Sequence, residues 1–307
     1  MEAQSEVDTG TPGRATTRAR ALVAACRPYQ WVKNLLVFFP LLTAHRLFDR
    51  RDAIPAVLAF VAFSLTASSA YILNDVVDLP RDRLHRTKAR RPFASGAVPI
   101  RWAFTAIPLL LLGAIGVSLA LPAGFQAVLA FYWALTTLYT LGLKRLAIVD
   151  VLALAGLYTV RLFGGSQASH VPLSNWIIAF SMFLFLSLAL VKRVAELLVA
   201  QATSRTASIG REYRVSDLAV LGRMGMSAGY SAVIVLALYL NSADVLRFYR
   251  HPDRLWLLCA LLVLWLSRVW LVTERGEMHD DPTVFALRDM ASYGIAAVSA
   301  LVLYWAT

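Results

Sequence analysis

The chain has 307 residues, of which 58% are hydrophobic and 16% are charged, so it is far more apolar than an ordinary soluble domain. Its charged residues gather in short segments between long uncharged stretches, which is typical of a membrane protein with several spans and excludes a soluble globular class. A net charge of +11 also invites a nucleic-acid-binding interpretation, but a basic inner face on a membrane protein explains that charge, and this class is set aside.

Stretches of about twenty apolar residues follow one another along the chain, and each is long enough to cross a bilayer as a helix. The fold class expected is therefore all-α, a polytopic membrane helical bundle of nine transmembrane helices. The first span is the most polar, because Lys33, Asn34 and His45 fall inside it. The expected spans are residues 30–48, 54–74, 102–121, 124–143, 147–164, 174–191, 218–240, 255–272 and 290–306.

Two domains are expected. Residues 1–28 are polar and contain no early apolar core, so we predict a disordered cytoplasmic tail and no secretory signal peptide. Residues 29–307 form one transmembrane domain. Lys and Arg concentrate in the tail and in the loops after the even-numbered spans, which places the N-terminus inside. Cys26 and Cys259 are far apart and indicate neither a disulfide nor a metal site.

The segment that ends the second span carries the chemistry. Asn74, Asp78 and Asp82 are spaced by four residues, with Asp75 beside them, so these oxygens can converge on a hard cation such as Mg²⁺. We expect the span to end near Asp78 with a kink, because Pro80 disfavours a continuous helix. Helix capping with ordinary solvated charges is the alternative, and three acids with an amide fit it poorly. A basic cluster suited to phosphates follows, Arg83, Arg86, Lys88, Arg90 and Arg91.

Three of the expected spans contain charged residues. Asp150 and Arg161 lie three helical turns apart on one face of the fifth span, where bridges to neighbouring helices are favoured over a substrate contact. Lys33 either extends to the membrane interface or contacts a phosphate. Arg268 is expected to extend to the interface and is left out of the site.

The acidic segment resembles the first aspartate-rich motif of the UbiA superfamily of intramembrane prenyltransferases, Asn74-Asp75-x-x-Asp78-x-x-x-Asp82. The resemblance covers nearly the whole chain from Arg27 onward. It implies nine helices and a Mg²⁺–diphosphate held by two acidic motifs, the second after the sixth helix. This chain departs there: it has one early glutamate, Glu196, no paired aspartates and several cations, Lys192, Arg193, Arg205, Arg211 and Arg214.

That departure resembles one branch of the superfamily, the decaprenyl-phosphate phosphoribosyltransferases. The match rests on four segments: Arg27-Pro28-x-Gln30-Trp31-Val32-Lys33-Asn34, His85-x-Thr87-Lys88-x-x-Arg91-Pro92, Lys192-Arg193-x-Ala195-Glu196-Leu197 and Ala286-Leu287-Arg288-Asp289. The resemblance implies transfer of 5-phosphoribose from phosphoribosyl diphosphate (PRPP) to a polyprenyl (decaprenyl) phosphate, with release of pyrophosphate. The product would feed arabinose donors for cell-envelope polymers.

The resemblance also implies the site. Mg²⁺ is expected on Asn74, Asp75, Asp78 and Asp82, the three aspartates being catalytic. The substrate-binding residues expected are Lys33, Asn74, Lys88, Arg91, Lys192, Arg193, Glu196 and Arg211. The partners expected are PRPP and the lipid acceptor, and the location is the bacterial inner membrane with the active-site loops in the cytoplasm.

Two other functions stay open. An aromatic prenyltransferase of the same superfamily, using a polyprenyl diphosphate in a quinone or haem pathway, predicts a second acidic pair that residues 192–217 lack. A transporter or channel places ionisable groups near the membrane midplane. Arg161 is the one clear candidate for that, while the acids cluster at the membrane edge.

Overall fold

The computed structural model describes residues 12–84, 87–203, 211–242, 245, 249–278, 281–286 and 288–306. Within these ranges the chain forms helices and no strand, which confirms the all-α class. The helices are α1 Pro12–Ala25, η1 Pro28–Phe38 (a 3-10 helix), α2 Phe39–Thr43, α3 Arg50–Val77, α4 Leu79–Arg83, η2 Lys88–Arg90, α5 Arg101–Ser118, α6 Ala123–Leu141, η3 Leu143–Arg145, α7 Val149–Ser169, α8 Asn175–Ala202, η4 Val215–Asp217, α9 Leu218–Leu240, η5 Pro252–Leu255, α11 Trp256–Glu274, α12 Pro282–Ala286 and α13 Met290–Ala306.

Six helical segments in the described ranges are long and apolar enough to cross a membrane: Arg50–Val77, Arg101–Ser118, Val149–Ser169, Asn175–Ala202, Val215–Leu240 and Pro252–Glu274. They coincide with six of the expected spans. Helix α6 lies where the fourth span is expected, and the shorter apolar helix α13 lies where the ninth is expected. The chain is a multi-pass membrane protein, and nine crossings stay a prediction.

The expected first span, residues 30–48, is not one long α-helix. A 3-10 helix, η1, covers Pro28–Phe38, and the five-residue α2 follows it. Polar side chains explain the difference: Asn34 is buried and donates to Ser64 Oγ at 3.0 Å, and Trp31 donates to Ser68 Oγ at 3.0 Å. Hydropathy alone counts this segment as a lipid-facing helix, whereas its polar groups find partners inside the protein.

Close packing holds η1 in the interior. A Cβ atom at Gly165 in α7 would lie 2.0 Å from the carbonyl oxygen of Val37. Only glycine allows that approach. As a result η1 lies against both α3 and α7, and it delivers Lys33 and Asn34 to the centre of the molecule.

The expectation of a disordered tail over residues 1–28 is wrong from Pro12 onward, because Pro12–Ala25 form α1. Ala25 is buried in a hydrophobic cluster with Ile72 and Phe93, and Leu22 packs against it. The burial of these apolar side chains stabilises the helix where composition alone suggests disorder. Residues 1–11 lie outside the described residues.

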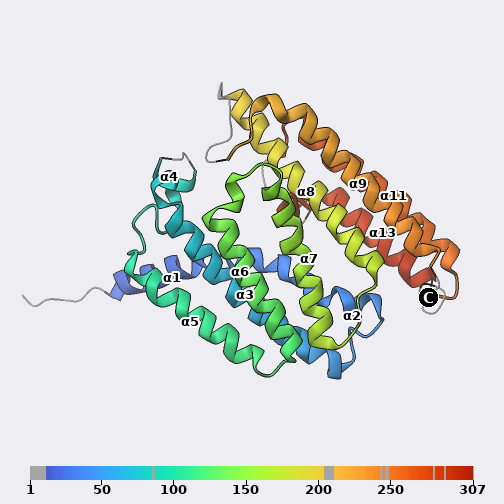
Figure 1. The fold of residues 1–307 in the computed structure, drawn as a ribbon, viewed down its shortest axis with the longest axis horizontal. Coiled ribbons are helices and arrows are strands. Elements are labelled where there is room, and N and C mark those ends of the chain that lie inside the picture. The colour runs from blue at the N-terminus through green and yellow to red at the C-terminus, as the bar shows by residue number, and fades with distance from the viewer. Residues whose placement is uncertain are drawn as a thin grey trace, which may run out of the picture.

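Helix α7 lies between the two hydrophobic cores. Val151 and Ala155 belong to a cluster formed with α8, α9 and α11, while Leu157 and Val160 belong to a second cluster with α3, α5 and α6. Figure 1 shows α7 between these two groups of helices. Residues that α7 carries near its N-terminal end therefore reach both halves of the protein.

The acidic segment breaks where it was expected to break. Helix α3 ends at Val77, and α4 begins at Leu79 with Pro80 in its first turn. Asp78 lies at the junction, and its backbone N–H still bonds to the Asn74 carbonyl at 2.9 Å. The kink turns Asp82 back towards the end of α3, which brings the whole acidic segment to one end of the bundle.

Candidate active site

A cavity of about 330 Å³ opens between the two halves. We call it the central cavity. Its walls come from η1, α3, α6, α7 and α8, and the segments that follow α4, α6, α8 and α11 contribute charged side chains. Eight of the eleven expected site residues line it: Lys33, Asn74, Asp78, Lys88, Arg91, Lys192, Glu196 and Arg211.

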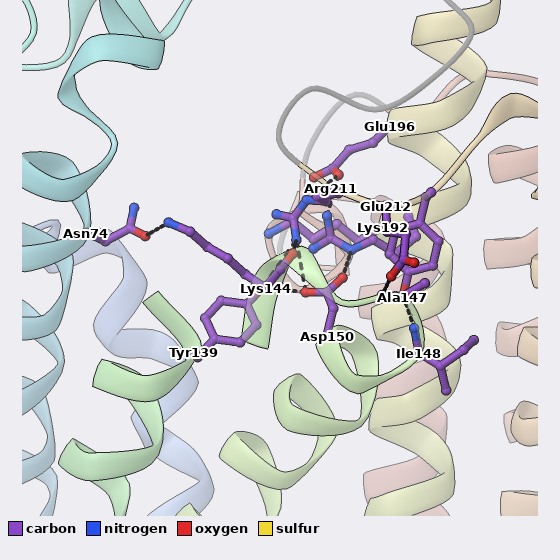
Figure 2. Close-up of polar contacts among 12 residues, drawn as sticks. Asn74, Tyr139, Lys144, Ala147, Ile148, Asp150, Lys192, Glu196, Arg211 and Glu212 are labelled. Atoms are coloured by element: carbon purple, nitrogen blue, oxygen red, sulfur yellow. Dashed lines mark hydrogen bonds and ion pairs between the residues drawn. The ribbon is translucent and has the colours of Figure 1, made fainter. Parts of the chain in front are cut away.

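One half of the acidic segment faces this cavity. Lys144, which follows α6 and is buried, donates to Asn74 Oδ1 at 3.0 Å and to both carboxylate oxygens of Asp78 at 2.7 Å. Figure 2 shows its side chain extended towards Asn74. Burial lowers the pKa of Lys144. The amine of Lys144 itself contacts the two side chains that were expected to bind Mg²⁺.

The other half of the acidic segment lies behind arginines. Asp75 and Asp82 are buried, with exposed fractions of 2% and 3%, and neither borders the cavity. Arg27 pairs with Asp75, and Arg91 pairs with Asp75 at 3.2 Å and with Asp82 at 2.6 Å. Both arginines line the cavity. In this conformation the two carboxylates present arginines to a substrate rather than facing it directly.

A buried ion network closes the opposite side. Asp150, with no exposed surface, pairs with Arg193 at 2.9 Å and with Arg211 at 2.9 Å, and accepts from Tyr139 Oη at 2.7 Å. Glu196 pairs with both arginines, at 3.4 Å from Arg211 Nε. Figure 2 shows Asp150 beneath this group. Arg193 is 1% exposed and lies behind the cavity wall, so the expected direct phosphate contact is not what this geometry offers.

The same network fixes the start of α7. Ile148 has a φ of 66°, a strained value for a β-branched residue, and its N–H donates to Tyr213 Oη at 2.9 Å. Ala147 N–H donates to Glu212 Oε2 at 3.1 Å (Figure 2). The segment after α8 is therefore bonded to the turn that presents Lys144 and Asp150.

Lys33 and Lys192 meet at a single carboxylate. Asp281 Oδ2 lies 3.0 Å from Lys33 Nζ and 3.1 Å from Lys192 Nζ, and all three residues line the cavity. Asp281 precedes α12, close in sequence to the late Ala286-Leu287-Arg288-Asp289 segment. In the same segment Asp289 pairs with Arg268, so Arg268 has a partner inside the protein. Leu287 and His85, which belong to the resembling segments, lie outside the described residues.

Arg161 lies at the floor of the cavity. It is 5% exposed, and it donates to Asn34 Oδ1 at 2.8 Å, to Tyr132 Oη at 2.8 Å and to the Leu157 carbonyl. Asp150 and Arg161 therefore bridge to neighbouring helices and not to each other. These are the bridges favoured from the sequence, and Arg161 also lines the cavity.

The donor set suits a hard cation, although the present arrangement does not assemble one. Among the residues that the structure describes, no three His, Cys, Asp or Glu side chains are close enough together to hold a metal ion. Asn74 and Asp78 nevertheless supply cavity-facing oxygens, and Asp75 Oδ2 is buried without a hydrogen-bond partner. Carboxylate and amide oxygens are the ligands that Mg²⁺ prefers. A metal would take the oxygens that Lys144 and Arg91 hold now.

Sequence reasoning missed several residues of the cavity. The sequence patterns single out none of Lys144, Tyr139 and Asp281. Lys144 and Asp78 are 66 residues apart, and Lys33 and Asp281 are 248 apart. One sequence feature could have indicated Lys144: like Asp78, it is a charged residue just after a long apolar stretch.

The chain is similar in sequence and in fold to known proteins. A sequence model of the UbiA prenyltransferase family matches residues 35–293. The chain is 34% identical over 300 residues to protein y4nM of Sinorhizobium fredii, covering 97% of this chain and 58% of that protein. It is 32% identical over 291 residues to a decaprenyl-phosphate phosphoribosyltransferase of Mycolicibacterium smegmatis, covering 93% of this chain and 92% of that one. A UbiA homologue from Archaeoglobus fulgidus bound to GPP and Mg²⁺ has the same fold, with a TM-score of 0.69 and 13% identity over 93% of this chain and 98% of that chain.

Proposed function

The chain belongs to the UbiA prenyltransferase family, and from this premise we propose that it transfers 5-phosphoribose from PRPP to a polyprenyl phosphate such as decaprenyl phosphate. Pyrophosphate is the second product. Two observations support the proposal: the similarity to the decaprenyl-phosphate phosphoribosyltransferase of Mycolicibacterium smegmatis, and the positive charge of the cavity lining.

The charge of the cavity carries the proposal. Its lining holds eight cationic side chains, Arg27, Lys33, Lys88, Arg91, Lys144, Arg161, Lys192 and Arg211, against three carboxylates, Asp78, Glu196 and Asp281. A prenyl diphosphate with a neutral aromatic acceptor brings one diphosphate. PRPP and a lipid phosphate together bring a diphosphate and two further phosphates, which match the excess of positive charge better.

Mg²⁺ would be held by the acidic segment, Asn74, Asp75, Asp78 and Asp82. When bound, the ion neutralises charge on the diphosphate that leaves. The chain's own residues do the rest. Lys144 keeps Asn74 and Asp78 turned to the cavity, and Arg27 and Arg91 can exchange their carboxylates for phosphate oxygens at little distance, because they already line the cavity.

The reaction is a displacement at the anomeric carbon with inversion. The bond from C1 of the ribose to the diphosphate oxygen breaks, and pyrophosphate leaves with the electron pair. An oxygen of the lipid phosphate forms the new bond to C1. Since the acceptor is already an anion, no general base is needed, and the protein's contribution is orientation and charge stabilisation. Lys88, Lys192 and Arg211 orient phosphates. Arg193, behind the wall, pairs with Asp150 and Glu196, and these two carboxylates in turn position Arg211.

The membrane arrangement follows from the same proposal. We place the chain in a bacterial inner membrane with nine crossings, the segment of η1 and α2 contributing to the first. The N-terminus and the charged end of the cavity face the cytoplasm, where PRPP is dissolved. The polyprenyl tail lies between the helices, and its phosphate reaches the cavity from the side.

The test is a transfer assay. Purified protein in detergent receives radiolabelled PRPP and polyprenyl phosphate, with Mg²⁺ or with a chelator. We expect a lipid-linked phosphopentose and stoichiometric pyrophosphate with Mg²⁺, and a loss of both when the metal is removed.

A parallel reaction separates the alternative. Here the protein receives a prenyl diphosphate and an aromatic acceptor, because the Archaeoglobus fulgidus homologue was solved with GPP. If the aromatic compound becomes prenylated while no lipid-linked pentose forms, the proposed function is wrong and the aromatic prenyltransferase takes its place.

A further inference from the structure

The cation at the floor of the central cavity differs from the others. Arg161 lies on α7, eleven residues beyond Asp150 and so about 16 Å further along the helix axis. It is 5% exposed, and its three nitrogens donate to the amide of Asn34, the phenol of Tyr132 and the backbone carbonyl of Leu157. A guanidinium has five N–H donors, so two are left for something in the cavity.

Arg161 has no acidic counter-ion within the part of the chain that the structure describes. The other cations that line the cavity include several that do: Lys144 has Asp78, Arg91 has Asp82, and Arg211 has Asp150. A buried cation without a counter-ion is costly, most of all in a helix that crosses a membrane. Neutral hydrogen bonds fix its position and leave its charge uncompensated, which is the arrangement expected where an incoming anion supplies the compensation.

A second cation and two aromatic rings lie next to Arg161. Lys33 Nζ lies 5.7 Å from the centroid of the Tyr158 ring, and the Arg161 guanidinium lies 5.5 Å from the same centroid. The Arg161 guanidinium also lies 4.8 Å from the centroid of the Tyr132 ring, and it donates a hydrogen bond to Tyr132 Oη. Asn34, which accepts from Arg161, is itself fixed by Ser64. Two cations therefore flank one aromatic ring, and both line the cavity.

We propose that Arg161, with Lys33 and Tyr132, forms a separate subsite for a phosphate monoester at the floor of the cavity. The subsite rests on the proposed function for its choice of ligand. Its occupant is either the 5-phosphate of the pentose donor or the phosphate of the lipid acceptor, which share the same chemistry. The donor carries anions at its two ends, and the cavity carries cations at its cytoplasmic end and at its floor.

The test compares Arg161→Gln with Arg268→Gln. Both variants remove an arginine from a long apolar helix, but Arg268 lies outside the cavity lining and pairs with Asp289. Binding of ribose 5-phosphate and of farnesyl phosphate to the Mg²⁺-loaded protein is measured by calorimetry, together with KM for PRPP and for polyprenyl phosphate. Loss of a charge-assisted contact to phosphate should weaken one ligand roughly 10- to 100-fold.

The two sources of the phosphate give different results. If the donor occupies the floor, Arg161→Gln loses ribose 5-phosphate binding and raises KM for PRPP, while farnesyl phosphate binds as before. If the acceptor occupies it, the pattern is reversed. Either result supports the subsite. If both ligands bind Arg161→Gln as tightly as they bind Arg268→Gln, the arginine is structural and the inference is wrong.

A second variant and a comparison of binding with transfer separate the remaining outcomes. Should Arg161→Gln fail to fold, Arg161→Lys replaces it, because lysine keeps the charge and loses the planar fork, so an intermediate loss of the same ligand is expected. The proposed function can also fail independently. Arg161-dependent binding of ribose 5-phosphate in a protein without pentosyl transfer refutes the reaction and supports the subsite, whereas transfer with KM values that ignore Arg161 refutes only the subsite.

Discussion

The two sides of the central cavity use similar charges in different ways. On the side of α3, Asp78 is paired with Lys144 and Asp82 with Arg91, and these cations line the cavity. On the side of α8, Asp150 has no exposed surface and pairs with Arg193 below the wall. Lys144, Asp78 and Arg91 therefore border the central cavity, whereas Asp150 and Arg193 lie behind its wall.

That difference separates exchange from support. A pair at the cavity wall can give one partner to a phosphate or a metal, because the partner that is released finds a new one nearby. A pair that is wholly buried cannot do so without leaving an uncompensated charge in the interior. We therefore expect a mutation of Asp78 to affect activity and a mutation of the buried Asp150 to affect stability.

The largest effect is expected for Asp150→Asn. Removing this carboxylate leaves Arg193 buried with Glu196 as its remaining acidic partner among the described residues. Breaking a buried ion pair from one side costs about 3–5 kcal/mol of unfolding free energy. Thermal unfolding of the protein in detergent should show the loss.

Asp253→Asn is the matched control for that experiment, since Asp253 is exposed in η5 and should leave the unfolding temperature unchanged. An Asp150→Asn protein as stable as Asp253→Asn, with lost activity, would move Asp150 from the supporting side to the exchanging side.

Asp78→Asn should behave in the opposite way. The carboxylate borders the cavity with a 19% exposed side chain, and Lys144 keeps its bond to Asn74, so the loss of stability should be smaller than for Asp150→Asn. Mg²⁺-dependent pyrophosphate release should fall at least roughly 100-fold, because a metal ligand and a partner of Lys144 are weakened together.

Asp49→Asn provides the comparison for Asp78→Asn. Asp49 caps the other end of α3, and asparagine caps a helix as well as aspartate does. Its activity should match that of the unmodified protein. Full activity of Asp78→Asn under the same conditions contradicts the metal assignment.

The sequence predicted the exchanging side better than the supporting side. The acidic segment is local: residues spaced by four share a helix face, and Pro80 marks where the helix breaks, so the position of Asn74, Asp78 and Asp82 could be read directly. Lys144 could not, because its contact with Asp78 joins residues that only the packing of α6 against α3 brings together.

The interior polar groups show the same limit. Residues 30–48 have the hydropathy of a span, yet η1 is held inside by bonds from Trp31 and Asn34 to serines of α3. Hydropathy records how apolar a segment is and not which neighbours its few polar atoms find. For Arg161, the sequence pattern predicts the helix and the face on which the residue lies. Its partners could be identified only from the positions of η1 and α6, which supply an amide and a phenol and, within the described residues, no carboxylate.

The smallest effect is expected for Tyr213→Phe, which tests how the supporting side holds the start of α7. Tyr213 Oη accepts from the N–H of Ile148, whose φ of 66° is strained. Leaving that donor unpaired should cost about 1–3 kcal/mol of unfolding free energy at neutral pH, with little change in KM. Unfolding measured near pH 8 gives this value.

The same variant has a signature at alkaline pH. Burial raises the pKa of Tyr213 above its ordinary value of 10.0, so the folded protein keeps the phenol protonated where the unfolded chain loses the proton. Stability from this group is complete below the unfolded pKa and is lost as the pH rises through the folded pKa. Tyr213→Phe should therefore lose less stability between about pH 9 and pH 11 than the unmodified protein. Parallel curves for the two proteins would show that the Tyr213 phenol has the same pKa in the folded and unfolded states, which would contradict its burial against Ile148.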